Sequence, residues 1–176
     1  YERPQKGRLR QFNQFGIELL GISSCMADIE VISVGYEFLK KLNIKGNVCL
    51  KINSLGDHDS RTNYKKVLVD YLNDYKCELS DESLKRLLEN PLRILDSKSE
   101  VDQNILVKAP NVLDYLNEES KERFERVCEG LKCLNIPYEI DKNLVRGLDY
   151  YCHTAFEFIT NNLGAQGTVL AGGRYD

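Results

Sequence analysis

Apolar and polar residues alternate near the start of the chain, and this pattern predicts a β-strand over residues 9–20. Phe15, Ile17 and Leu19 would share the buried face of that strand. The opposite face would carry Phe12, Gln14, Gly16 and Glu18. Because a slip of one residue would exchange the two faces, the pattern predicts which side chains are available to a ligand.

Helical spacing replaces this alternation further along the chain. Apolar residues over 28–42 recur every three or four positions, which predicts a helix, and alternation over 48–52 predicts a second strand. Residues 57–135 have the pattern of several helices. One apolar stripe of this block runs from 64 to 75 and another from 124 to 134, and we expect the two stripes to pack on each other.

Boundary residues support these elements. Ser80 is expected to cap a helix, and Asn135 to stop the last helix of the block. Strands are predicted again over 138–140 and 151–160, and a hairpin loop at 161–164 then leads into a further strand from Thr168 to Ala171.

The order of elements is sheet, helical block, sheet. It predicts an α+β fold in which a mostly antiparallel sheet core is interrupted by a helical insertion domain. We expect residues 1–56 and 141–176 to form parts of the core and residues 57–140 to form the insertion, with a small core of its own.

Composition places the chain among soluble globular proteins, with 42% hydrophobic and 29% charged residues. Contact with a membrane is not expected, because no apolar run approaches the roughly 20 residues that cross a bilayer. No signal peptide is visible, so we expect a cytoplasmic protein. The chain does not begin with Met and its last residues, 172–176, stop within a motif, so we expect a piece of a longer protein.

The six cysteines are scattered, and none forms a CxxC pair. His58 and His153, the two histidines, are not placed to complete a zinc site with them, so no metal site is expected. We expect reduced and mostly buried thiols.

Charge is unevenly distributed along the chain. The net charge of −3 argues against a globally basic nucleic-acid-binding protein. Residues 1–20 carry four basic and two acidic side chains, whereas residues 57–140 carry 13 basic and 18 acidic ones. This distribution favours a small anionic ligand at the N-terminal segment over a broad nucleic-acid footprint.

Three segments carry candidate chemistry. Gln14 and Glu18 flank Gly16, which leaves room for a polar ligand, although a solvated edge-strand face explains the same pattern. The basic loop over residues 3–8 suits phosphate oxygens, but it also suits a surface turn. Arg146 lies between an apolar pair and a glycine turn, where it serves either a ligand or a loop salt bridge with Asp149.

Together these segments resemble the histidyl-tRNA synthetases, which are class II aminoacyl-tRNA synthetases. Residues 1–21 look like motif 2 of that class, residues 146–151 like the first histidine-specific motif, and residues 171–176 like the start of the second. The runs at 53–56, 90–93 and 96–98 also resemble the bacterial-type enzyme, so the resemblance extends over the whole chain in the family's order.

This resemblance implies an enzyme that activates L-histidine with ATP, assisted by Mg²⁺, and transfers it to the 3′ end of tRNA(His). It implies that Arg146 stabilises the reacting phosphate, that the complete protein is a homodimer, and that this segment alone is inactive. The ATP-binding residues would be Glu2, Arg8 and Phe12. The histidine-binding residues would be Gln14, Glu18, Tyr150, Tyr151 and Tyr175. The helical insertion would contact tRNA through Arg61, Lys65, Lys66, Lys85, Arg86 and Arg123.

Two related kinds of protein are alternatives. The synthetase-like regulatory subunit of ATP phosphoribosyltransferase would bind or sense rather than acylate. A pseudo-synthetase module of a translation-regulating kinase would bind uncharged tRNA. The presence of Gln14, Glu18, Arg146 and Tyr151 argues against the first, and the bacterial-type insertion argues against both.

Overall fold

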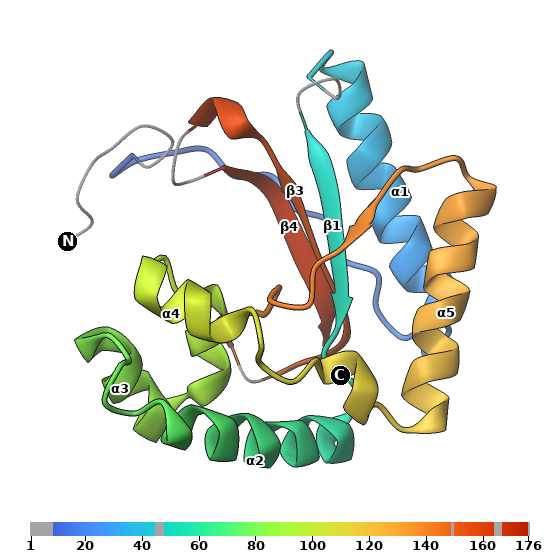
Figure 1. Cartoon of the computed structure of the whole chain (residues 1–176). Helices are drawn as coiled ribbons and strands as arrows, with labels where there is room; N and C mark the ends of the chain where they lie inside the picture. The colour runs from blue at the N-terminus through green and yellow to red at the C-terminus, as the bar shows by residue number, and fades with distance from the viewer. Residues whose placement is uncertain (1–8, 45–47, 149, 164–166, 176) are drawn as a thin grey trace.

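A four-stranded mixed sheet forms the centre of the protein (Figure 1). The computed structural model describes residues 9–44, 48–148, 150–163 and 167–175. The strand order is β2-β1-β3-β4, with β1 at Cys49–Ser54, β2 at Glu139–Ile140, β3 at Tyr151–Ile159 and β4 at Thr168–Tyr175. The pairing of β1 with β2 is parallel, and the other two pairings are antiparallel. The predicted α+β architecture with a mostly antiparallel sheet is therefore confirmed.

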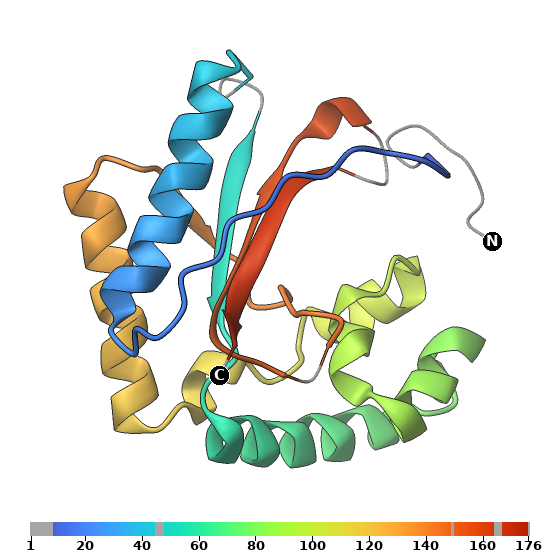
Figure 2. The ribbon, with the colours of Figure 1, turned by 180° about the vertical axis from the view of Figure 1, so that it is seen from behind.

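Two helices cover one face of this sheet (Figures 1 and 2). They are α1, Cys25–Lys41, and α5, Glu118–Cys133. Gly130 of α5 allows the two helices to approach closely, because a Cβ there would lie 2.3 Å from Cδ1 of Ile29. The core between helices and sheet is made of Ile29, Ile32, Leu39, Leu50, Ile52, Phe124, Val127, Cys128, Leu131, Ile136, Phe156 and Phe158.

Short polar residues set the limits of these helices. Ser24 and Asn117 cap the first turns of α1 and α5 by accepting a hydrogen bond from a backbone N–H. Asn43 and Asn135 follow the same two helices with φ of 60° and 53°, a left-handed conformation that asparagine tolerates and that stops a helix. The predicted stop at Asn135 is confirmed.

A second group of helices packs around its own core. It contains α2 (His58–Asp74), α3 (Asp81–Glu89), α4 (Glu100–Leu106) and the short 3-10 helices η2 (Pro91–Asp96) and η3 (Val112–Tyr115). Ser80 caps α3 as predicted, since its hydroxyl accepts from the Ser83 N–H at 3.3 Å. The buried apolar residues of this helical group are Tyr64, Leu68, Leu72, Leu79, Leu87, Ile94, Leu95, Ile105, Leu106, Ala109 and Val112.

The two apolar stripes of the middle region do not pack on each other. The stripe from 64 to 75 lies in the core of the helical group, whereas the stripe from 124 to 134 lies in the core of the sheet. The expected mutual packing is therefore wrong. Helical spacing identifies the apolar face of a helix but not the surface that covers it. The second core is formed mainly by residues from α2 to η3, whereas α5 packs with α1 on the sheet.

The N-terminal segment also differs from its prediction. Residues 9–23 run beside β4 without forming a strand (Figure 2). A ladder of backbone hydrogen bonds with a neighbouring strand is what enforces alternation, and no described strand pairs with this segment. Between β3 and β4, the predicted hairpin loop contains the 3-10 turn η4, Asn161–Leu163. None of the helices in the described residues is long and apolar enough to cross a membrane.

Candidate active site

The candidate site lies along β4, the edge strand of the sheet. Phe156 and Phe158 of β3 point into the helix-covered core, so strand alternation turns Glu157 to the other face. A cavity of about 590 Å³ lies along β4, and it is bounded by the N-terminal segment and by Val31, Val34, Gly35 and Phe38 of α1. Its polar and aromatic lining includes Gln14, Glu18, Arg146, Tyr151 and Tyr175.

Small residues form the floor of this cavity. Ala171, Gly172 and Gly173 of β4 contribute to its lining. A Cβ at Gly173 would lie 2.9 Å from the Tyr151 ring and 3.1 Å from the Thr154 carbonyl oxygen. The glycine therefore permits a close approach between β4 and the tyrosine side chain.

Three tyrosine rings cluster at one end of the cavity. Tyr151 and Tyr175 are register partners in β3 and β4, and their ring centroids lie 6.4 Å apart. The Tyr150 ring lies 4.5 Å from Tyr151 and 5.8 Å from Tyr175. Hydrogen bonding with Tyr150 lowers the pKa of the Tyr151 phenol, and the nearby Arg146 guanidinium lowers it further. Burial and a hydrogen bond with Glu18 raise the pKa of Tyr175.

Arg146 is held against this cluster. Its guanidinium carbon lies 5.0 Å from the centroid of the Tyr151 ring, and its Nη1 donates to Oε1 of Glu157 at 3.3 Å. Its Nε is buried and has no hydrogen-bond partner among the described residues. A buried donor without a hydrogen-bond partner is costly.

Contacts of the loop before Arg146 and the local geometry of β3 position Arg146 and Tyr151. The buried Asn53 of β1 donates to the carbonyl oxygen of Leu144 at 3.0 Å, which fixes the loop leading to Arg146. Around His153, which has a φ of 46°, β3 shifts its register with β4. Such bulges redirect adjacent side chains, here those at the start of β3.

Comparison with known proteins identifies the family. A family profile described as "Histidyl-tRNA synthetase" matches residues 1–176. The chain belongs to the histidyl-tRNA synthetase family. It is 56% identical over 176 residues to the histidine–tRNA ligase of Rhodospirillum rubrum and 53% identical to that of Wolbachia pipientis from Culex pipiens. All of the chain is covered in both cases, but only 42% and 43% of those relatives, so it spans less than half their length.

Solved structures agree with this membership. The apo histidyl-tRNA synthetase of S. aureus superposes with a TM-score of 0.66 at 36% identity, over 89% of this chain and 37% of that one. The Nostoc histidyl-tRNA synthetase, at 22% identity and a TM-score of 0.53, over 87% of this chain and 41% of that one, shares the fold.

The structure brings most of the predicted histidine-binding residues of this family member together. Gln14, Glu18, Tyr151 and Tyr175 line one cavity, and Tyr150 contacts two of their rings. Phe12 is 66% exposed and is not part of the cavity lining. Two predicted ATP-binding residues of the family's motif 2, Glu2 and Arg8, lie outside the described residues.

The apolar face predicted for the N-terminal segment is not buried. Phe15, Ile17 and Leu19 are 71%, 40% and 37% exposed, and the first two line the same cavity as Gln14 and Glu18. The predicted burial is therefore wrong, because a segment without a paired strand need not send alternate side chains to opposite sides.

The candidate tRNA contacts fall into two groups. Lys65, Lys66 and Lys85 are exposed. The three arginines have partners within the chain. Arg61 donates to the Tyr151 carbonyl oxygen at 2.5 Å, Arg86 pairs with Glu82, and Arg123 donates to the Ser23 carbonyl oxygen at 2.6 Å.

Sequence reasoning missed Asn53 and Glu157 as parts of this site. The signal for Glu157 was present: it is an acidic residue between two core phenylalanines of a strand. Among the described residues, no group of three or more His, Cys, Asp or Glu side chains could hold a metal ion. The cysteines are less buried than expected, since Cys77 and Cys133 are exposed and Cys128 is the buried member of the set.

Proposed function

We propose that this chain forms the central part of the catalytic domain of a histidine–tRNA ligase. Such an enzyme would activate histidine with ATP to histidyl-adenylate and then transfer the histidyl group to tRNA(His). The observation that carries this proposal is the shared cavity of Glu18, Tyr151 and Arg146, which combines groups for an imidazole with a guanidinium for a phosphate. The chain spans 42% of the R. rubrum relative, so we propose that it works within a longer protein.

The recognition of histidine follows from hydrogen-bond chemistry. A neutral imidazole has one N–H donor and one acceptor nitrogen. The Glu18 carboxylate would accept from the ring N–H, and the Tyr151 hydroxyl would donate to the other nitrogen. Gln14 would bind the α-amino group. A site built in this way disfavours apolar side chains, because its own polar groups would lose their partners.

Arg146 would act in the activation step. A carboxylate oxygen of histidine attacks the α-phosphorus of ATP, a new P–O bond forms, and the bond to the leaving pyrophosphate breaks. Two anions meet in this step, and a fixed guanidinium stabilises the negative charge between them. Histidine already reacts as a carboxylate, so no side chain has to remove a proton from it.

The remaining expectations concern partners of the complete protein. Mg²⁺ would accompany the ATP phosphates, and the described residues contain no group of three or more His, Cys, Asp or Glu side chains that could hold it. The exposed Lys65, Lys66 and Lys85 support contact with tRNA phosphates, to which lysine ammonium groups bind as point charges. A cytoplasmic homodimer is proposed from the family resemblance.

The test is histidine-dependent exchange of pyrophosphate into ATP by a full-length ligase that carries this segment. Arg146→Ala should lower the exchange rate about 100- to 1000-fold, as loss of one electrostatic donor commonly does in a closed site. Arg126→Ala is the matched control, because Arg126 pairs with Glu122 on the exposed surface of α5. Near-normal exchange by Arg146→Ala would remove this residue from the mechanism.

A further inference from the structure

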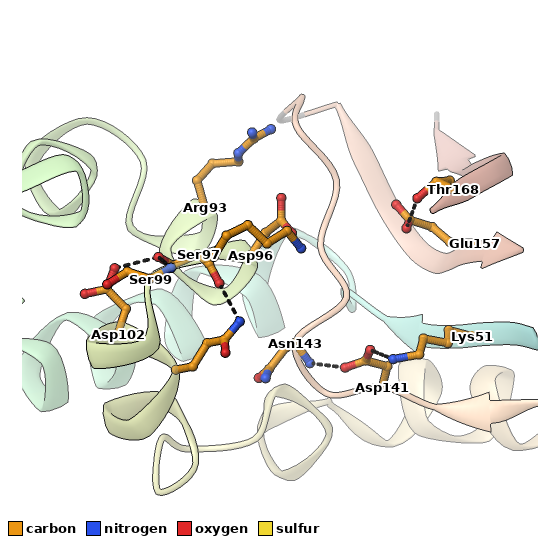
Figure 3. Close-up of polar contacts among 12 residues, drawn as sticks. Lys51, Arg93, Asp96, Ser97, Ser99, Asp102, Asp141, Asn143, Glu157 and Thr168 are labelled. Atoms are coloured by element: carbon orange, nitrogen blue, oxygen red, sulfur yellow. Dashed lines mark hydrogen bonds and ion pairs between the residues drawn. The ribbon is translucent and has the colours of Figure 1, made fainter. Parts of the chain in front are cut away.

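Glu157 of β3 is fixed from two sides. Its Oε1 accepts from Nη1 of Arg146 at 3.3 Å. Its Oε2 accepts from the hydroxyl of Thr168 at 3.0 Å (Figure 3). With both oxygens engaged, the carboxylate is restrained between the loop that carries Arg146 and the first residue of β4. The Arg146 and Glu157 side chains are only 21% and 19% exposed, so solvent screens this pair less than a surface pair.

The neighbours of Glu157 in β3 and β1 do not neutralise its negative charge. Phe156 and Phe158, on either side, belong to the apolar core. Lys51 is the register partner of Glu157 in β1, but its ammonium group binds Asp141 at 2.8 Å instead (Figure 3). Among the described residues, Glu157 forms an ion pair with Arg146.

Glu157 also lies outside the cavity that would hold the substrates. That cavity is lined by Arg146 and Tyr151, but neither Glu157 nor Thr168 belongs to its lining. The contact through which Glu157 can influence the reaction is its hydrogen bond with Arg146. The guanidinium is bound at Nη1 and stacked on Tyr151, while Nε keeps an unused donor.

We infer that Glu157 is a positioning residue that orients the Arg146 guanidinium for the reacting phosphate, with Thr168 fixing the carboxylate in turn. This inference rests on the proposed function of Arg146. Orientation matters because a small misplacement of a group near the reacting atoms can lower the rate by about 100-fold.

Charge and orientation predict opposite results when Glu157 is removed, and this difference makes the inference testable. A carboxylate beside a guanidinium reduces the positive potential that the guanidinium presents to a phosphate. If charge alone mattered, removal of Glu157 would strengthen ATP binding and raise the rate. If orientation matters more, removal lowers kcat and leaves KM nearly unchanged, since the loss falls on the transition state.

The experiment measures kcat and KM for pyrophosphate exchange by the full-length ligase with Glu157→Ala and Glu157→Gln. Glu157→Ala should lower kcat by about 10- to 100-fold, with KM for ATP and histidine within about threefold of the parent. Glu157→Gln should retain kcat within about fivefold, because its amide oxygen still accepts from Arg146. A raised kcat in Glu157→Ala, or a change confined to KM, would overturn the inference.

Lys51→Met is the matched control. It breaks the neighbouring ion pair with Asp141 on the same sheet face and leaves Arg146 untouched. Its thermal unfolding should change as much as that of Glu157→Gln, while its kcat stays at the parent value. An equal fall in kcat would show a general disturbance of this face and would overturn a specific role for Glu157.

A double-mutant cycle separates this inference from the proposed function. If Glu157 acts through Arg146, Glu157→Ala should not lower kcat further in an Arg146→Ala background. Normal exchange by Arg146→Ala alone would contradict the proposed function. A large loss with Arg146→Ala but none with Glu157→Ala would contradict only the positioning role.

Discussion

Arg174 at the end of β4 forms a 2.8 Å ion pair with Asp28 in the first turn of α1. The same guanidinium donates to the carbonyl oxygen of Ile22 at 2.7 Å, and the other oxygen of Asp28 accepts from the Thr154 hydroxyl at 2.7 Å. This network joins the segment that follows Glu18 to the strand that carries Tyr175. It therefore fixes two walls of the candidate site relative to each other.

We expect Arg174→Met to destabilise the protein by about 3 kcal/mol, because the substitution removes the closer of the two guanidinium groups that pair with the buried Asp28 and leaves only Arg123, 3.9 Å away. The two side chains are only 10% and 6% exposed. Urea denaturation measures the change in the free energy of unfolding. Lys98→Met, which breaks the solvent-exposed pair with Asp96, should cost less than about 1 kcal/mol. Equal losses in the two variants would argue against a structural role for the buried pair.

Asp102 should make stability depend on pH. Burial by itself raises the pKa of this carboxyl group, but hydrogen bonds from Ser80, Ser83 and Ser97 outweigh it and hold the pKa below its usual value. Figure 3 shows Ser97 beside Asp102. Because the pKa is lower in the folded than in the unfolded state, the stabilisation is present above the unfolded pKa and is lost as pH falls through the folded pKa.

Asp102→Asn should therefore lose about 2 kcal/mol at pH 7, and the difference from the parent should shrink as pH falls below about 4. Unfolding by urea at several pH values between 3 and 7 measures this. Asp96→Asn, whose carboxylate is half-exposed, should show no comparable effect. A constant difference across the whole range would rule out titration of Asp102 as the cause.

Glu18→Gln should raise the KM for histidine more than the KM for ATP. The carboxylate is an acceptor only, whereas an amide presents either a donor or an acceptor. The amide is therefore less selective for the N–H group of the imidazole ring. Hydrogen bonds to charged groups contribute about 1.5–3 kcal/mol, which corresponds to a roughly ten- to hundredfold loss of apparent histidine affinity. Steady-state pyrophosphate exchange with each substrate varied in turn gives both constants. A loss of ATP binding with normal histidine affinity would move Glu18 to the nucleotide site.

The 176-residue chain by itself should form no histidyl-adenylate. Phe12 is largely exposed, and the cavity is bounded on one side by a segment without a paired strand, so the site is not closed to water. Pyrophosphate exchange by the purified chain, compared with a full-length ligase at equal concentration, tests this. Exchange above background would show that residues 1–176 contain a complete site.

Local sequence patterns predicted much of the fold. A strand was predicted over residues 151–160, where β3 lies, and helical spacing predicted α1 and α2. Ser80 and Asn135 marked helix limits correctly, since capping and left-handed turns depend on the side chain of one residue. The motif residues Glu18, Arg146 and Tyr151 were recognised from their neighbours in sequence, and the structure places them around one cavity.

Only the tertiary structure decided which surfaces meet. The apolar stripe of α5 was visible in the sequence, but its burial against α1 and the sheet depends on the close contact at Gly130. Residues 9–20 alternate as a strand would, yet alternation becomes structure only where a neighbouring strand supplies hydrogen bonds. Arg146 pairs with Glu157, which lies on another element. An ion pair depends on the distance between two side chains in space. The positions of Arg146 and Glu157 in the sequence do not specify that distance.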